Sequence, residues 1–390
     1  MRIALVHRRF TTHGGTERYL VNLTGHLARS GHEVHVFCNE VRKDLKEAPP
    51  GITFHHLPML KWGGLLKAAS LCLSAHLLVP RKEFDIVQGF GRTLIQDVLR
   101  AGGGCHHVYY DSLLSEAGYL KRLILRISPR HRLTLWIERR QYRLPNYRRI
   151  IAVSNRVRDE LVKRLGVDPQ RVEVVYNGVD LDRFHPENRT RFRSLMRAAH
   201  GVPVEARVAL FLGTGYRRKG LDTALRAFSR VSGEDRFMMV AGGDAAEWAY
   251  RRLARSLGIE KRVVFCGATE EPERCYAAAD LFVFPTRYEP FGNVCVEAMA
   301  SGLPVITTSV NGATEVFPRE AGDLVISDPE DVEGLAERLK RLLSDPEGSA
   351  RLGAACRQAA EALTWEANGR RVEAIYRAVL AEKTRSSYGG

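Results

Sequence analysis

The sequence predicts an α/β protein built from two doubly wound parallel sheets, and three observations lead to that prediction. Short apolar runs alternate with helix-like segments along the first half of the chain, which is typical of a parallel sheet covered by helices. The alternation repeats after the turn-rich segment 177–186. The chain has 390 residues, which is more than one hydrophobic core usually supports, so two domains of about 180 residues each are expected.

Composition is that of a globular protein with a strong positive charge. Hydrophobic residues make up 45% of the chain, charged residues 27%, and the net charge is +14. This charge indicates an anionic partner, and it leaves nucleic acid, a membrane surface and a phosphorylated substrate open. The 7 cysteines are scattered without a C-x-x-C pair, which suggests reduced thiols in a cytosolic setting. We expect neither export nor a membrane span, because no apolar run has the length that either requires.

The first half begins with a strand at 2–6, followed by Gly14-Gly15 and a segment with helical spacing of its apolar residues. Two glycines at a helix entry let the backbone approach a ligand, and a helix N-terminus favours an anion. A tight turn that needs positive φ accounts for the glycines equally well on these residues alone. Further strands of this half are expected at 33–37, 52–57, 85–87, 150–153 and 172–175.

The second half is expected to form strands at 208–212, 237–241, 263–266, 281–284 and 305–307. Ligands of open α/β sheets bind beyond the carboxyl ends of the strands. A ligand shared by the two halves would therefore lie in a cleft between them.

Glu289 and Glu297 carry one carboxylate at each end of a loop and helix start that follow the strand at 281–284. Asn293 is a plausible N-cap, and the positive end of such a helix binds phosphate. The two carboxylates could face either side of a diphosphate that links hydroxyl-rich groups. For an isolated pair of glutamates the alternative is that Glu289 is a solvated loop residue and that Glu297 only complements the helix dipole.

Three consecutive cations follow the strand at 208–212, in the segment Gly213-Thr-Gly-Tyr-Arg-Arg-Lys-Gly220. The glycine spacing fails as a dinucleotide fingerprint, because Arg218 stands where the third glycine is needed, and it fails as a P-loop. Fixed cations beside a helix start would stabilise the charge of a departing nucleoside diphosphate without a metal. A solvated charged surface is the alternative.

Together the two motifs resemble the donor site of retaining glycosyltransferases of family four with the GT-B fold, in which two Rossmann-like domains face each other across a cleft. The resemblance rests on the two glutamates set in E-P-F-G-N and followed by EAMASGLPVI, and on the pair Lys219-Gly220. It implies transfer of a sugar from a nucleoside diphosphate sugar with retention of configuration, and with neither a bound metal nor another cofactor. It also implies an acceptor-binding domain at 1–182, onto which a C-terminal helix at 366–390 packs, and a nucleotide-sugar-binding domain at 183–365.

The resemblance assigns roles to the residues that match the family's motifs. Glu297 would bind the ribose hydroxyls and Glu289 the donor sugar hydroxyls. Lys219 and Arg218 would hold the diphosphate, although Thr214 occupies the place where many members have the arginine. Backbone groups of further residues would complete the donor site: Gly14, Gly15, Cys266, Gly267, Phe291, Gly292, Asn293 and Val294.

On the acceptor side, the resemblance implies a histidine beside the reacting sugar. His106 is the first candidate and His107 the second, and Asp97 is a weaker candidate for acceptor contact. With Glu289, Arg218 and Lys219, His106 completes the expected catalytic group. A metal site at the His-His pair is disfavoured, because no further ligand appears at useful spacing.

The segment 112–149 concentrates the positive charge, with 10 Lys or Arg residues against 2 Glu. Apolar residues at helical spacing, with Lys121, Arg122 and Arg126 between them, suit the surface of an anionic membrane. Trp136, Tyr142 and Tyr147 are expected as interfacial aromatics. An ordinary helix with a solvated face and a site for acceptor phosphates are the alternatives, and no nucleic-acid module surrounds the segment.

Among family members, the pattern Arg217-Arg-Lys-Gly220 and the basic segment 112–149 most resemble the lipopolysaccharide core glucosyltransferases. This implies UDP-glucose as donor and a lipid-linked inner-core sugar as acceptor, at the cytoplasmic face of the inner membrane. Other nucleotide sugars or acceptors and a non-transferring GT-B epimerase remain alternatives. A basic protein that binds nucleic acid fits the glutamate motif poorly.

Overall fold

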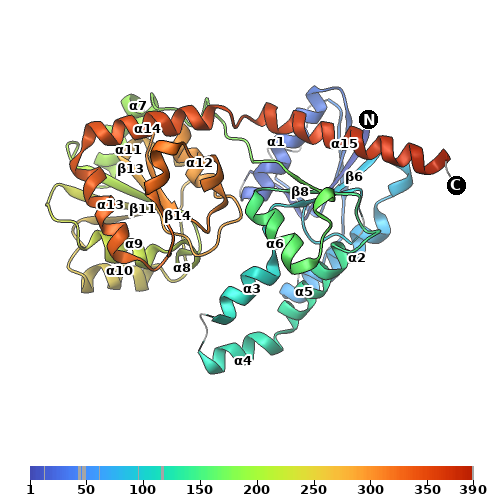
Figure 1. The fold of residues 1–390 in the computed structure, drawn as a ribbon, viewed down its shortest axis with the longest axis horizontal. Coiled ribbons are helices and arrows are strands. Elements are labelled where there is room, and N and C mark those ends of the chain that lie inside the picture. The colour runs from blue at the N-terminus through green and yellow to red at the C-terminus, as the bar shows by residue number, and fades with distance from the viewer. Residues whose placement is uncertain are drawn as a thin grey trace. The chain divides into compact units, whose positions relative to one another are not determined.

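The computed structural model describes residues 1–12, 14–42, 45, 50–60, 62–94, 96–115 and 118–388, and of residues 115, 121 and 386–388 the backbone alone. It divides into two compact units (Figure 1). Unit 1 comprises Met1–Asn177 and Trp365–Gly390, and unit 2 comprises Gly178–Thr364. The division lies a few residues before the expected boundary at 182.

Unit 1 is built on a seven-stranded parallel sheet with the strand order β5-β3-β1-β6-β7-β8-β9. Its strands are β1 (Arg2–Val6), β3 (Glu33–Cys38), β5 (Ile52–His56), β6 (Ile86–Gly89), β7 (Val98–Ala101), β8 (Arg149–Ala152) and β9 (Val172–Val174). All were expected except β7. The short apolar run of β7 is interrupted by Arg100, which is buried. The Arg100 guanidinium lies over the Tyr19 ring, and its Nη2 donates to Asn177 Oδ1 at 2.6 Å.

Helices cover this sheet and close the core of unit 1. They are α1 (Gly15–Arg29), α2 (Gly64–Leu78), α3 (His106–Ser115), α4 (Tyr119–Ile127), α5 (Pro129–Gln141), α6 (Asn155–Leu165) and α15 (Trp365–Tyr388). As expected, the last helix returns to unit 1, where it runs along α1 (Figure 1). Val372 and Tyr376 join Leu20 and Leu23 in one buried cluster. Along the described chain, no helix combines the length and apolar character that crossing a bilayer requires.

Unit 2 is a second Rossmann-like unit with a six-stranded parallel sheet in the order β12-β11-β10-β13-β14-β15. Its strands are β10 (Arg207–Leu212), β11 (Arg236–Ala241), β12 (Val263–Gly267), β13 (Leu281–Phe284), β14 (Val305–Thr308) and β15 (Val325–Ile326). Only β15, two residues long, was not expected. The strands carry continuous apolar runs because helices cover both faces. The order places β10 and β13 side by side at the centre.

The helices of unit 2 follow the strands in alternation. They are α7 (Asn188–Ala199), α8 (Tyr216–Lys219), α9 (Leu221–Phe228), α10 (Glu247–Ser256), α11 (Pro272–Ala278), α12 (Asn293–Ala300), α13 (Val332–Ser344) and α14 (Pro346–Glu361). The short elements α8 and α12 begin just after β10 and just after the loop that follows β13. Both therefore stand at the carboxyl edge of the sheet, where ligands of such sheets bind.

Asp280 fastens α7 to this sheet. Its carboxylate accepts hydrogen bonds from Arg189, Arg193 and Arg197 of α7, at 3.0, 2.8 and 3.0 Å, and from the Val208 backbone N–H at 2.9 Å. Arg197 is fully buried. Burial alone would raise the pKa of Asp280, but the arginines and the Val208 N–H outweigh it, so its pKa is lowered.

Replacing Asp280 with Ala should destabilise unit 2, because the buried Arg197 guanidinium would lose its carboxylate. We expect a loss of about 3–5 kcal/mol in the free energy of unfolding, measured by chemical denaturation. The exposed Arg191→Ala on the same helix should change it by less than about 0.5 kcal/mol. Because the folded-state pKa of Asp280 is lowered, this stabilisation should hold above pH about 4 and fade as the pH falls further. Equal small effects of both substitutions would contradict the anchoring role.

Candidate active site

The carboxyl edge of the sheet in unit 2 brings together Arg218, Lys219 and Glu289. Arg218 and Lys219 lie in α8, and Glu289 lies in the loop between β13 and α12. Arg218 Nη1 donates to Glu289 Oε2 at 3.0 Å and to the Tyr288 carbonyl at 2.7 Å, and Lys219 Nζ donates to the same carboxylate oxygen. The sequence predicted these residues in one site, and the structure places them in contact. The cations form a short helix of their own, whereas we expected them in a loop before α9.

Two glycines allow close approaches of neighbouring segments at this site. Gly220 has φ +76°, and a Cβ there would lie 1.9 Å from the Pro285 carbonyl oxygen. Gly292 has φ +80°, and a Cβ there would lie 2.4 Å from Asn311 Oδ1. A side chain at Gly220 would force α8 away from the loop after β13, and one at Gly292 would displace Asn311. The Lys-Gly pair is thus needed for the close approach of α8 to the loop after β13.

Burial and charge together set the ionisation of the cluster. Burial lowers the pKa of Lys219, although Glu289 acts in the opposite direction. Burial would raise the pKa of Glu289, but Lys219 and Arg218 outweigh it and lower that pKa. Lys219 Nζ also lies 4.6 Å from the centre of the Phe284 ring. Glu289 is therefore an ionised carboxylate that contacts two basic side chains.

The loop after β13 is held by residues that sequence reasoning missed. Thr286 Oγ1 donates to the Arg218 carbonyl at 3.0 Å, and the Arg287 N–H donates to the same oxygen at 2.8 Å. The Arg287 guanidinium donates to both carboxylate oxygens of Asp222 at 2.9 Å. These contacts tie the loop to α8 and α9, so the position of Glu289 depends on them. Their only sequence signal is their place beside the glutamate motif.

The helix that carries Glu297 begins one residue earlier than predicted. The N-cap of α12 is Gly292 and not Asn293, because only glycine is tolerated in the left-handed conformation against Asn311. Glu297 is buried, and its Oε2 accepts a hydrogen bond from Tyr276 Oη at 3.1 Å. Asn311 Nδ2 donates to Thr307 Oγ1 at 3.0 Å, and Asn311 Oδ1 accepts from the Ala313 N–H at 3.1 Å.

The remaining predicted donor residues lie at the expected edges of their sheets. Cys266 and Gly267 end β12, and Phe291 is buried in the loop before α12. Val294 lies in the first turn of α12. In unit 1, Gly14 caps α1 with φ +100° and Gly15 opens the helix. Their roles toward a ligand stay predictions.

Glu17, in the first turn of α1, was missed by sequence reasoning. It accepts a hydrogen bond from Arg9 at 2.9 Å and lies 3.8 Å from His7 Nε2. Burial acts to raise its pKa, yet hydrogen bonds with His7 and Arg9 lower that pKa to about 2. The α1 entry therefore already holds a paired carboxylate.

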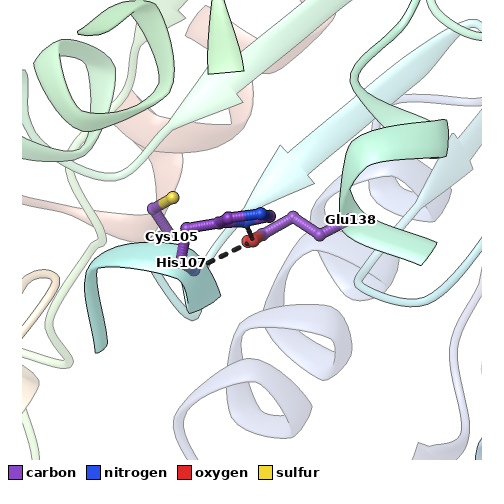
Figure 2. A group of neighbouring side chains, drawn as sticks. All are labelled: Cys105, His107 and Glu138. Atoms are coloured by element: carbon purple, nitrogen blue, oxygen red, sulfur yellow. Dashed lines mark hydrogen bonds and ion pairs between the residues drawn. The ribbon is translucent and has the colours of Figure 1, made fainter. Parts of the chain in front are cut away.

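His107 lies in a compact cluster with Cys105 and Glu138 (Figure 2). Potential metal-ligating atoms of the three residues lie within 4.8 Å of one another, a grouping that sequence spacing did not reveal. Glu138 reaches over from α5 and accepts the His106 and His107 backbone N–H groups at 2.6 and 3.0 Å, as well as His107 Nδ1–H. Arg139 Nε donates to His107 Nε2 at 3.1 Å. The cluster thus caps the start of α3, and both ring nitrogens of His107 are engaged.

His106 stacks on His131, with 3.3 Å between His106 Nε2 and His131 Nδ1. Burial, which outweighs the opposing effect of Glu138, lowers the pKa of His106 to about 4. The imidazole is therefore neutral at pH 7. A neutral ring can accept a hydrogen bond from a sugar hydroxyl or donate one.

Asp97 does not lie where an acceptor contact was expected. It precedes β7, at the amino edge of the sheet, opposite the edge where ligands bind. Its Oδ2 accepts hydrogen bonds from the Val87 N–H at 2.9 Å and from Lys383 Nζ at 3.2 Å. Asp97 thus fastens α15 to the sheet, a structural role in place of the predicted acceptor contact.

The basic segment 112–149 is not one helix: it comprises the end of α3, all of α4 and α5, and the stretch that leads to Arg149 at the start of β8. In Figure 1, α4 projects away from the sheet of unit 1. Its side chains Leu120, Ile124 and Ile127 are exposed at 70%, 57% and 63%. Arg126 is exposed, Arg122 Nε donates to the Leu114 carbonyl, and the Lys121 side chain lies outside the described residues.

Three aromatic residues of the segment were expected at an interface. Trp136 is exposed, as an interfacial residue would be. The prediction was wrong for Tyr142 and Tyr147, because both are buried in the core of unit 1.

Comparison with known proteins bears directly on this architecture. The family model described as Glycosyltransferase Family 4 matches residues 13–183, and the one described as Glycosyl transferases group 1 matches residues 192–359. The two matches fall on the two halves of the chain that the repeated alternation of strands and helices predicted.

Individual proteins are similar over most of their length. Lipopolysaccharide glucosyltransferase WaaG of Escherichia coli K12 is 25% identical over 347 residues, which are 88% of this chain and 90% of that protein. The crystal structure of WaaG has a TM-score of 0.80 at 23% identity and covers 96% of this chain and 99% of its own. The Anabaena protein HepE, solved with UDP and glucose, has a TM-score of 0.71 at 19% identity and covers 97% and 100%. The two family matches and the fold described above agree with the GT-B architecture that the sequence predicted. This chain therefore belongs to the GT-B glycosyltransferases, with a family 4 domain followed by a group 1 domain.

Proposed function

We propose that this glycosyltransferase moves glucose from UDP-glucose to a membrane-associated glycolipid, with retention of configuration. The observation that carries the proposal is the contact of Arg218 and Lys219 with Glu289 at the carboxyl edge of unit 2. Support for the donor comes from HepE, which was solved with UDP and glucose. Support for the acceptor comes from the name of WaaG, a lipopolysaccharide glucosyltransferase.

The donor diphosphate would bind against Lys219 and Arg218. Both basic side chains already share one carboxylate, and a diphosphate would bring further negative charge and further hydrogen-bond acceptors to them. As the bond from the sugar C1 to the diphosphate breaks, negative charge grows on the leaving oxygen. Fixed cations in a partly buried site stabilise that charge without reorganisation. In this proposal they do the work that a metal ion does in other transferases.

Glu289 would position the sugar and would not attack it. Its lowered pKa keeps it ionised, so it cannot act as a general acid, and its pairing with two cations weakens it as a nucleophile. An ionised carboxylate is a strong acceptor for sugar hydroxyls. The acceptor oxygen would bond to C1 on the face that the diphosphate leaves, and its proton would pass to the leaving phosphate oxygen. Glu297 would take the ribose hydroxyls, and neutral His106 would orient the acceptor hydroxyl.

An anionic membrane surface would bind the interfacial surface, which we define as Leu120, Ile124, Ile127 and Arg126 of α4. Its three apolar side chains are more than half exposed. Exposed apolar side chains among cations suit a bilayer interface, where each cation adds about 1 kcal/mol. The proposal puts the enzyme on the cytoplasmic face of the inner membrane.

Replacing Lys219 with Ala should remove binding of the donor, because the diphosphate would lose its buried cation. We expect UDP to raise the melting temperature of the wild-type chain, GDP and ADP to raise it less, and UDP to have no effect on the variant. Transfer to acceptor should fall by about 10²–10³-fold in kcat. The exposed Lys261→Ala in the same unit is the matched control and should behave as wild type. Stabilisation by UDP that persists in Lys219→Ala would refute this role.

Chelation should not affect turnover, since Lys219 and Arg218 are proposed to take the place of a metal. Wild-type enzyme treated with excess EDTA and then desalted should transfer sugar at its original rate. A loss of activity that added Mg²⁺ or Mn²⁺ restores would contradict this part of the proposal.

Replacing Leu120 and Ile124 with Gln should weaken sedimentation with anionic vesicles, because apolar area would no longer enter the interface. With about 1.5–3 kcal/mol for each buried side chain, the partition coefficient should fall at least about tenfold. Leu195→Gln, a leucine exposed at 69% on α7, is the matched control and should leave partitioning unchanged. Equal partitioning of all three proteins would rule out α4 as a membrane contact.

A further inference from the structure

A pocket of about 310 Å³ opens at the carboxyl edge of the sheet in unit 1. Val6 and His7 at the end of β1 and Phe90 and Gly91 after β6 form one side of it. The first half of α2 and the start of α5 form the other. Its position is the one that ligands of open α/β sheets occupy, and none of the residues predicted for the donor lines it.

The pocket combines an apolar floor with four cations. Val6, Ala68, Leu71 and Phe90 supply apolar surface. The cations come from four separate places along the chain: Arg8, Lys67, Arg92 and Arg130. Among the described residues that line the pocket, none carries a carboxylate.

The cations lie close enough to repel one another. Burial, followed by repulsion from Arg130 and Arg8, lowers the pKa of Arg92. The Arg130 side chain lies against Gly64, where a Cβ would be 3.5 Å from Arg130 Nε. No ion pair joins any of the four to a carboxylate within the described parts of the chain. Clustered guanidinium groups without a counter-charge match the geometry of a phosphate, which accepts several hydrogen bonds at once.

Two helix starts add to this potential. The N-cap of α2 is Gly63, which has no side chain to cap the helix, and α2 then contributes Gly64, Lys67 and Ala68 to the pocket. Arg130 lies in the first turn of α5. The positive ends of both helices therefore reinforce the four side chains.

We propose that this pocket binds a phosphate group of the acceptor, so that the enzyme selects a phosphorylated and not a neutral acceptor. The inference rests on the proposed function, because it takes unit 1 as the acceptor-binding unit. His106 is near enough to Arg92 to feel its charge, so an acceptor held by its phosphate would have hydroxyls close to the neutral imidazole. The apolar floor would cover the carbon skeleton next to the phosphate.

Calorimetric titration of the full chain with sn-glycerol 3-phosphate, in saturating UDP to fill the donor site, tests the proposal. Wild type should bind the phosphate ester and should not bind glycerol. Arg92→Gln combined with Arg130→Gln should raise the Kd at least about tenfold, since charge-assisted hydrogen bonds are lost. Lys67→Gln provides an independent variant with the same expected direction. Arg132→Gln, exposed two residues along α5 and outside the pocket, is the matched control and should bind as wild type.

An unchanged Kd in the double variant, or equal binding of glycerol, would overturn the proposal. UDP titration of the same proteins separates this failure from failure of the proposed function. If the double variant binds UDP normally and loses only the phosphate ester, both stand. If wild type does not bind UDP, the proposed function fails, and the titration with phosphate ester still decides the pocket.

Vesicles of phosphatidylcholine with phosphatidic acid distinguish a lipid phosphate from a phosphate on the sugar portion. If glycerol 3-phosphate displaces wild type from these vesicles but leaves binding of the double variant unchanged, the pocket holds a lipid headgroup. If vesicle binding of wild type is insensitive to glycerol 3-phosphate, the pocket holds a phosphate that lies away from the bilayer.

Discussion

The close approach of α8 to the loop after β13 is the constraint on which the donor side of this protein depends. β10 and β13 are neighbours at the centre of the sheet, so the segments that leave their carboxyl ends meet. Gly220 lets the two backbones touch, and Thr286 and Arg287 hold them there. This contact places two cations on one carboxylate at Glu289. A lysine and a glutamate that would be costly to bury singly are thereby held in contact with each other, in a site that is mostly closed to water.

Unit 1 uses the same edge of a similar sheet in a different way. Its carboxyl edge carries an apolar pocket ringed by cations without carboxylates among the described lining residues, whereas the cations of unit 2 are already paired. The start of α3 is capped by Glu138 from α5, which fixes the backbone of His106. Burial, against the opposing effect of Glu138, lowers the pKa of the His106 imidazole to about 4 and keeps it neutral at pH 7. The ion pairs of Arg218 and Lys219 with Glu289 fix the geometry of the site in unit 2. The cations of the pocket in unit 1 would attract an anionic ligand. We infer that the two units divide these tasks between an activated donor and an anionic acceptor.

Much of the fold could be predicted because buried parallel strands appear as continuous apolar runs, and each half supplied a series of them. The strand β7 was missed because Arg100 is buried within it, where an aromatic ring and an amide compensate its charge. The cluster of Arg218, Lys219 and Glu289 was predictable, since each lies in a motif that follows a strand. The cap by Glu138 and the role of Asp97 toward Lys383 were not, because they join residues far apart in sequence. Nor can amphipathic tyrosines be assigned to surface or core from spacing alone, as the buried Tyr142 and Tyr147 illustrate.

The central claim is that Lys219 and Arg218 bind the diphosphate of the donor beside Glu289. A crystal structure of the chain with UDP tests it most directly. The account predicts diphosphate oxygens within hydrogen-bond distance of Lys219 Nζ and the Arg218 guanidinium, with the ribose hydroxyls on the Glu297 carboxylate. UDP bound elsewhere, with both cations still paired only to Glu289, would contradict it.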